Sequence, residues 1–332
     1  MKTATETREV ITVEAGRGSL RGTYHKPRGA SVDPDGRNRI GVLYLCWLVP
    51  RAANGDSAVY WADAMAKSGY FTFRFDLPGL GDSDGDLATP GIEIDAGAYG
   101  PALSAMVSSL VERFHLSAMV VVGNCAGAVT AVYAAAANDR VRGLVLLDPY
   151  FHVQQNGEDQ TVLLQWHVRI LNKLLGSRVA QSGLRDAAVK VLSFARNVYR
   201  GVTSNHLLVR RKQMPGNANL TLIRSWSKLA AARLPMLVLR SPSAMPKAGE
   251  FDYIGFLETP PDSGSRLTSK FIERATHAFA ESYGREAVRT HSEEWFSTYF
   301  PLTDRAGIPD TGNHSTEIAS GVLGIAANVH SV

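Results

Sequence analysis

Cysteine is scarce in this sequence of 332 residues. The two cysteines, Cys46 and Cys125, are too few for a disulfide framework, and neither lies in the cysteine and histidine spacing of a metal site. The chain has no uninterrupted apolar run of about 18 residues, the length that a membrane-spanning helix needs. Its first residues are polar and lack the apolar stretch of a secretory signal. We therefore expect a cytoplasmic protein with no metal, no structural disulfide and no membrane span.

A strong overall charge and a nucleotide-binding fingerprint are also missing. The 35 Lys and Arg residues nearly balance the 31 Asp and Glu residues, so the formal net charge is only +4. The glycine-rich stretch Gly79-Leu80-Gly81-Asp82 lacks the third glycine of a dinucleotide-binding loop. We therefore expect neither a nucleic-acid partner nor a bound cofactor.

Apolar runs and helical patterns alternate through most of the chain. This alternation predicts an α/β fold with a mainly parallel sheet and helices on both faces. Two short strands around a turn at Gly16-Arg17-Gly18 are expected to precede it. The expected strands of the parallel part are 39–47, 70–76, 116–123, 141–147, 236–240 and 270–275, and the expected helices include 57–68, 90–114 and 286–300.

The segment from 151 to 233 interrupts this alternation, because its pattern indicates successive helices without convincing strands. It lies between two expected strands of the sheet, where a lid over an active site would be inserted. We therefore divide the chain into an N-terminal core part, 1–150, a helical lid, 151–233, a C-terminal core part, 234–302, and an extension, 303–332.

The charge of the predicted lid differs from that of the rest of the chain. Residues 151–233 hold thirteen Lys or Arg residues and three acidic ones, a formal net charge of +10, so the remaining residues carry −6. Such an asymmetry favours an acidic partner, for example a carrier protein or the phosphates of coenzyme A. The alternative is that these charges only solvate the outer faces of helices. Nothing in the sequence indicates the oligomeric state.

One short stretch joins an expected strand to an expected helix. The apolar run Met119–Val122 ends in Gly123-Asn124-Cys125-Ala126-Gly127, and small residues follow. This is the strand–turn–helix pattern G-x-S-x-G of a nucleophile elbow, with cysteine in place of serine. The two glycines leave room for a strained turn, and a helix N-terminus favours the thiolate form of cysteine. The alternative is an ordinary buried cysteine between a strand and a helix.

Four stretches together resemble the α/β-hydrolase family. They are FRFDLPGLGDSDG at 73–85, GNCAGA at 123–128, RGLVLLDPY at 142–150 and RATHAF at 274–279, in the order of the family. The cysteine elbow is most similar to the hydrolases associated with exosortase systems and with biosynthetic gene clusters. The resemblance implies an α/β-hydrolase fold whose lid follows the sixth core strand.

The resemblance also implies a nucleophile and a base. Cys125 is the expected nucleophile of acyl chemistry, and His277, which follows the last expected strand, is the expected base. The backbone N–H groups of Ala126 and of either Trp47 or Leu48 are the expected donors to an oxyanion.

The acid that would orient the base is left open. The family usually has an aspartate after the seventh core strand, but residues 240–246 contain no carboxylate. Asp148, at the end of the preceding strand, and Asp252 are the leading candidates, and Glu250 is the third. A Cys–His dyad without an acid is another alternative, because a thiol needs less activation than a hydroxyl. Two further residues, Asn124 and Arg51, are expected to line the pocket.

Three functions fit these residues. The first is a thioesterase or acyl hydrolase that forms an acyl-cysteine intermediate from a thioester or ester. The second is an acyltransferase or cyclising enzyme of a biosynthetic pathway, because an acyl-cysteine reacts readily with amines and thiols. The third is a non-catalytic binding protein with the same fold, since the expected acid is missing after the seventh strand. The acyl group and its acceptor leave no recognisable signature in the sequence.

Overall fold

The computed structural model describes residues 7–15, 18–28, 39–45, 55–85, 90–153, 214–247, 249–258 and 266–302. The chain divides into two compact units, Met1–Pro301 and Leu302–Val332. Only Leu302 of the second unit is described, so the predicted extension 303–332 lies outside the described residues. The fold below is that of the first unit.

Strands and helices alternate along this unit. The strands are β1 (Arg8–Glu14), β2 (Ser19–His25), β3 (Ile40–Leu45), β4 (Phe71–Phe75), β5 (Ala118–Asn124), β6 (Val141–Leu147), β7 (Met236–Arg240) and β8 (Leu267–Phe271). The helices are α1 (Gly55–Lys67), α2 (Pro90–Asp95), α3 (Gly100–Arg113), α4 (Ala126–Ala137), α8 (Leu220–Ala231), α9 (Tyr253–Glu258) and α10 (Ser282–Tyr299), with a short 3₁₀ turn η3 (Pro242–Ala244).

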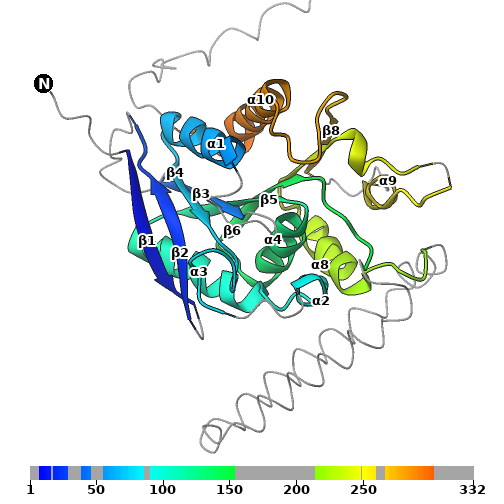
Figure 1. Ribbon diagram of the computed structural model, residues 1–332, viewed down its shortest axis with the longest axis horizontal. Helices are drawn as coiled ribbons and strands as arrows, with labels where there is room; N and C mark the ends of the chain where they lie inside the picture. The colour runs from blue at the N-terminus through cyan, green and yellow to red at the C-terminus, as the bar shows by residue number, and fades with distance from the viewer. Residues whose placement is uncertain are drawn as a thin grey trace, which may run out of the picture. The chain divides into compact units, whose positions relative to one another are not determined.

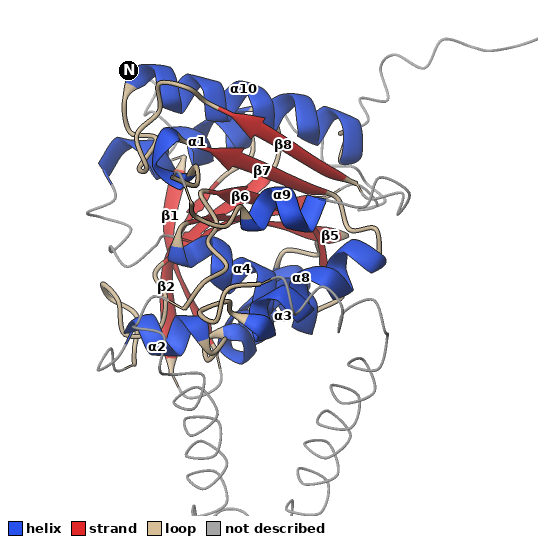
Figure 2. Cartoon of the chain, turned by 90° about the vertical axis from the view of Figure 1, so that its right-hand side faces the viewer, coloured by secondary structure: helices blue, strands red, loops and turns tan. Residues whose placement is uncertain are grey.

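The strands form one sheet of eight, in the order β1-β2-β4-β3-β5-β6-β7-β8. β2 runs antiparallel to both of its neighbours, and the strands from β4 to β8 are parallel to one another. Helices α1 and α10 cover one face of the sheet, and α3, α4 and α8 cover the other (Figures 1 and 2). This is the mainly parallel, doubly covered sheet that the alternation predicts.

The central strands are apolar because both of their faces are covered by helices. Every residue of β3 and of β5 is buried. Helix α4 is also buried on most of its surface, since it lies between α3 and α8, and its alanines and glycine let these helices approach closely. β8 is the opposite case: it forms one edge of the sheet and has no fully buried residue.

Two expected elements differ from the structure. The predicted helix 90–114 is confirmed in its C-terminal part by α3 but is interrupted before it, where α2 ends and α3 begins around Gly97, which has a φ of +73°. A Cβ atom on Gly97 would lie 2.9 Å from the Tyr133 ring, so a tertiary contact selects this break. The predicted strand 270–275 is shifted, because β8 ends at Phe271 and a turn follows, in which the Ala275 N–H donates to the Ile272 carbonyl at 3.1 Å.

The predicted lid range contains one helix that the structure describes. Helix α8 packs against α4, and its Trp226 is buried edge-on against Phe151, with ring centroids 5.2 Å apart. Residues 154–213 lie outside the described residues, so a lid there stays a prediction. Across the part of the chain that is described, no helix is both long enough and apolar enough to cross a membrane.

Candidate active site

Cys125 stands at the turn between β5 and α4. Its φ of 52° and ψ of −114° lie in a region that residues with a side chain rarely adopt. Such a conformation costs on the order of 1–3 kcal/mol and persists only where the surrounding structure imposes it. Here the Cys125 N–H donates to the Leu147 carbonyl of β6 at 2.9 Å, so the sheet itself holds the strained turn.

The glycine two residues before Cys125 is required by packing. A Cβ atom on Gly123 would lie 2.3 Å from the carbonyl oxygen of Gly127 and 2.6 Å from the Ala128 nitrogen. These atoms belong to the backbone of the first turn of α4 and cannot rotate away. The missing side chain therefore lets α4 start directly behind the end of β5, which is the geometry that the elbow pattern predicts.

His277 lies on the loop between β8 and α10. Its carbonyl accepts a hydrogen bond from the Asn124 side-chain amide at 3.4 Å, so Asn124 ties this loop to the elbow. The neighbouring Thr276 donates its N–H and its hydroxyl to the two carboxylate oxygens of Glu281, both at 2.7 Å. Phe279, two residues after His277, has a φ of 48° and a completely buried side chain, which holds the loop against the core.

Asp148 follows the last residue of β6 and is the carboxylate that meets His277. Its Oδ2 lies 2.8 Å from His277 Nδ1, and its side chain is fully buried. A buried carboxylate is costly unless hydrogen bonds satisfy it. Ser241 at the end of β7 supplies two of them, from its N–H to Oδ1 at 2.7 Å and from its hydroxyl to Oδ2 at 2.6 Å.

The charge state of His277 reflects both of these neighbours. A hydrogen bond that His277 donates to Asp148, and a second one with Cys125, raise the pKa of His277 to about 10, although partial burial opposes the shift. Since Asp148 contacts Nδ1, the other ring nitrogen is the one left for chemistry at the sulfur. Cys125, His277 and Asp148 therefore form one connected chain of hydrogen-bonding groups from three different loops.

The other two acid candidates make different contacts. Asp252 forms an ion pair with Arg240 at 3.4 Å and accepts the Gly255 N–H at 3.0 Å. Glu250 accepts the Lys247 N–H at 2.9 Å in an exposed turn. The structure thus places Asp148, and neither of these, against His277, and the histidine has a carboxylate partner rather than standing in a bare dyad.

The structure describes only some of the residues that were predicted for the oxyanion hole and the pocket. Ala126 is the first residue of α4, where backbone N–H groups have no partner within the helix. Trp47, Leu48 and Arg51 lie outside the described residues, so their roles stay predictions. Where the structure is described, no group of His, Cys, Asp and Glu side chains could hold a metal ion.

Three residues that are linked to Asp148 or Cys125 have no part in the sequence predictions. Ser241 lies in the stretch 240–246, where the family resemblance leads one to expect a carboxylate. Tyr150 follows Asp148 by two residues, and burial, then the negative charges of Asp95 and Cys125, raise the pKa of its phenol. Asp95, at the end of α2, is 1% exposed. Tyr150 could have been predicted, because it belongs to the LLDPY stretch that contains Asp148. No sequence signal indicates Asp95.

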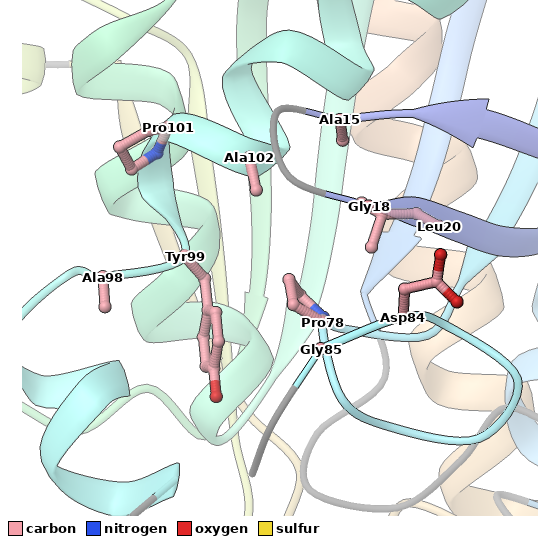
Figure 3. A pocket seen from close by; sticks show the side chains of 10 residues that line it. All are labelled: Ala15, Gly18, Leu20, Pro78, Asp84, Gly85, Ala98, Tyr99, Pro101 and Ala102. Atoms are coloured by element: carbon pink, nitrogen blue, oxygen red, sulfur yellow. The ribbon is translucent and has the colours of Figure 1, made fainter. Parts of the chain in front are cut away.

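A cavity of about 360 Å³ lies elsewhere in this unit, between the β1–β2 hairpin, the loop after β4 and the start of α3. Figure 3 shows Tyr99 and Pro101 on one side of it and Gly18, Leu20 and Asp84 on the other. Asp84 is already engaged there, since its carboxylate accepts the Ser19 N–H at 2.9 Å. Cys125, His277 and Asp148 do not line this cavity.

Comparison with known proteins identifies the fold. Residues 51–193 match the family described as the alpha/beta hydrolase fold, whereas no curated protein sequence matches the chain. A dienelactone hydrolase from Anabaena variabilis is 16% identical, with a TM-score of 0.51 over 88% of this chain and 98% of that one. An esterase from Pyrococcus furiosus is 12% identical, with a TM-score of 0.53 over 88% and 93%. The α/β hydrolase GrgF from a Penicillium species is 16% identical, with a TM-score of 0.53 over 89% and 99%.

These similarities confirm the predicted fold class. The chain has the α/β-hydrolase fold, and its mostly parallel sheet of eight strands is flanked by helices. The family match and the solved structures agree on this fold. The narrower likeness to cysteine-elbow hydrolases of exosortase systems and biosynthetic gene clusters stays a prediction.

Proposed function

We propose that this protein is an acyl hydrolase of the thioesterase type that works through an acyl-cysteine intermediate on Cys125. One observation carries the proposal: Cys125, on a strained strand-to-helix turn, is joined through His277 to the buried carboxylate of Asp148. A nucleophile, a base and a group that orients the base are the parts that acyl transfer requires. The fold, which solved esterases share, is compatible with hydrolysis.

The reaction would proceed in two steps. His277 takes the thiol proton, the Cys125 sulfur bonds to the acyl carbon, and the leaving thiolate or alkoxide departs with a proton from His277. Water then attacks the acyl-cysteine and passes a proton to His277, and the bond from the acyl carbon to Cys125 breaks as His277 returns this proton to the sulfur. Asp148 stays ionised throughout and stabilises the imidazolium form of His277. The Ala126 N–H, with a second donor at Trp47 or Leu48, would bind the oxyanion.

The charge of residues 151–233 supports a thioester carried by an acidic partner. Their net charge of +10 would attract an acidic carrier protein or the phosphates of coenzyme A. Cysteine also suits this substrate class, since thiol–thioester exchange is close to balanced in energy. If this attraction operates, turnover of a carrier-bound thioester falls as salt is raised, and turnover of a small neutral ester does not.

Acyl transfer is the second candidate, and one observation favours it. The Tyr150 phenol is close enough to Cys125 and to Asp95 for both to raise its pKa, so a polar side chain lies beside the reacting sulfur. An amine or alcohol held there would compete with water for the acyl-cysteine. The enzyme would then be an acyltransferase or a cyclising enzyme of a biosynthetic pathway.

Intact-protein mass spectrometry tests these proposals. Wild type and Cys125→Ala are exposed to a panel of acyl thioesters and esters, with and without amine and alcohol acceptors. We expect an acyl adduct on wild type alone, and its decay in buffer identifies hydrolysis, whereas decay only with an acceptor identifies transfer. If wild type shows neither adduct nor turnover across the panel, the nucleophile assignment fails and a non-catalytic binding role replaces it.

A further inference from the structure

Ser241 occupies the place where the acid was expected and not found. It directly follows β7, and its side chain is completely buried. Both of its donors go to the same carboxylate: its N–H to Asp148 Oδ1 at 2.7 Å and its hydroxyl to Asp148 Oδ2 at 2.6 Å. Asp148 comes from the adjacent strand, β6. The end of β7 therefore contributes a clamp on the carboxylate rather than the carboxylate itself.

The clamp acts on a residue that needs support. Asp148 has a φ of 44°, and its own N–H donates to the Leu239 carbonyl of β7 at 2.9 Å. Backbone and side chain of Asp148 are thus both tied to β7. The Ser241 hydroxyl is oriented in turn, because its oxygen accepts the Ser243 N–H at 3.2 Å within η3. Its proton is left to point at Asp148 Oδ2.

We infer that Ser241 is a positioning residue of this active site, one that fixes the Asp148 carboxylate so that Oδ2 faces Nδ1 of His277. The inference rests on the proposed function, because it matters for chemistry only if His277 serves Cys125. Hydrogen bonds to charged groups are stronger than those between neutral groups, so two of them favour one rotamer of a buried carboxylate. Without them, Asp148 would meet His277 for a smaller share of the time.

The same geometry predicts that the acid can be moved between strands. The Ser241 hydroxyl lies 2.6 Å from the oxygen that contacts His277, so a carboxylate at position 241 would reach nearly the same point. In the exchange variant Asp148→Ser/Ser241→Asp, the two positions trade roles. We expect the exchange variant to be at least about tenfold more active than Asp148→Ser, because the base regains an orienting carboxylate.

The test uses Ser241→Ala and needs no knowledge of the substrate. The rate at which iodoacetamide alkylates Cys125 is measured from pH 5 to pH 11, and the His277 ring is titrated by NMR. We expect His277 to titrate at lower pH than in wild type, and alkylation to slow by about tenfold at neutral pH. Ser241→Thr, which keeps the hydroxyl, should restore both, whereas Ser241→Val should not.

Three outcomes decide between explanations. If Ser241→Ala lowers only the melting temperature and leaves both pH profiles unchanged, Ser241 is merely structural and the inference is overturned. If Ser241→Ala does not fold, the Thr and Val variants decide, and equal profiles for these two overturn it. If the profiles shift as expected but wild type forms no acyl adduct, the proposed function fails while the positioning role of Ser241 stands.

Discussion

Cys125 and Asp148 both have positive φ angles, 52° and 44°, and each follows the last residue of a buried parallel strand. Each is held by a backbone hydrogen bond to the neighbouring strand, to the carbonyls of Leu147 and Leu239. Two strained residues therefore stand at the ends of adjacent strands. Backbone strain of this kind is concentrated at functional sites, where packing can impose it.

Gly123 gives the first prediction at this scale. Gly123→Ala should destabilise the protein by about 1–3 kcal/mol, because the new Cβ would overlap the backbone of α4. It should also slow Cys125 alkylation, since the elbow must shift. Gly91→Ala in α2 is the control, because a Cβ there meets nothing within 4 Å, and its stability should change by less than about 1 kcal/mol. Urea unfolding compares the two variants, and equal losses would contradict the packing argument.

The second prediction at the residue scale concerns Asp148. Hydrogen bonding to Asp148 is the largest cause that raises the His277 pKa to about 10, so Asp148→Asn should bring that pKa back toward 6.5. Activity should then be lost at a lower pH on the alkaline side of the profile, because the His277 imidazolium loses its proton there. We also expect kcat to fall by about 10²- to 10⁴-fold. A pH–rate profile checks this. An Asp252→Asn profile that moved instead would reassign the acid.

At the scale of elements, the loop between β8 and α10 depends on one acidic residue. Glu281 stands at the N-terminus of α10 and binds both donors of Thr276, next to His277. The residue that precedes α10 therefore ties the catalytic loop to the start of the helix. This arrangement keeps His277 in place although the loop follows an edge strand.

Glu281→Gln should loosen this loop. The amide oxygen can still accept the Thr276 N–H and the amide N–H group can donate to the Thr276 hydroxyl oxygen, but both hydrogen bonds lose their charge assistance, at a cost of about 1 kcal/mol. We expect turnover to fall several-fold, mainly in kcat, since His277 moves and the pocket does not. Glu273→Gln is the control, because Glu273 lies exposed on the same loop. Steady-state kinetics of both variants would contradict the argument if Glu273→Gln were equally impaired.

The sequence was informative where a local rule applies and uninformative where strands meet. The elbow followed from residues 123–127, because tight turns restrict residue types. The choice of Asp148 over Asp252 did not follow from a local pattern, since only the arrangement of the strands in the sheet brings one of these carboxylates to His277. Ser241 was overlooked because its role needs a partner on another strand. The helix break at Gly97 depends on Tyr133, which is distant in sequence.

At the scale of the whole molecule, two histidines link stability to pH from opposite sides. His25 is buried between Asp63, 2.7 Å from its Nδ1, and Arg74, whose Nε donates to its Nε2 at 3.0 Å. Burial, more than any neighbour, lowers the pKa of His25 to about 4. His277 is shifted the other way, to about 10.

The fourth prediction is a stability maximum near pH 6.5. Unfolded His25 takes up a proton below pH 6.5 and the folded residue does not until about pH 4, so stability falls as pH drops through this window. The full shift is worth about 3 kcal/mol. The contribution of His277 is complete below pH 6.5 and is lost as pH rises through about 10. Urea unfolding across this range should show both slopes, and His25→Gln should flatten only the acid one.

The position of β8 affects the order in which the protein loses activity and unfolds on heating. β8 is the edge strand beyond β7, has no fully buried residue, and leads into the loop that carries His277. Edge strands open at lower free energy than the strands at the centre of a sheet. The segment that carries His277 can therefore open locally while the centre of the sheet stays folded. Inactivation should precede melting, and the amides of β8 should exchange with deuterium well before those of β3 and β5.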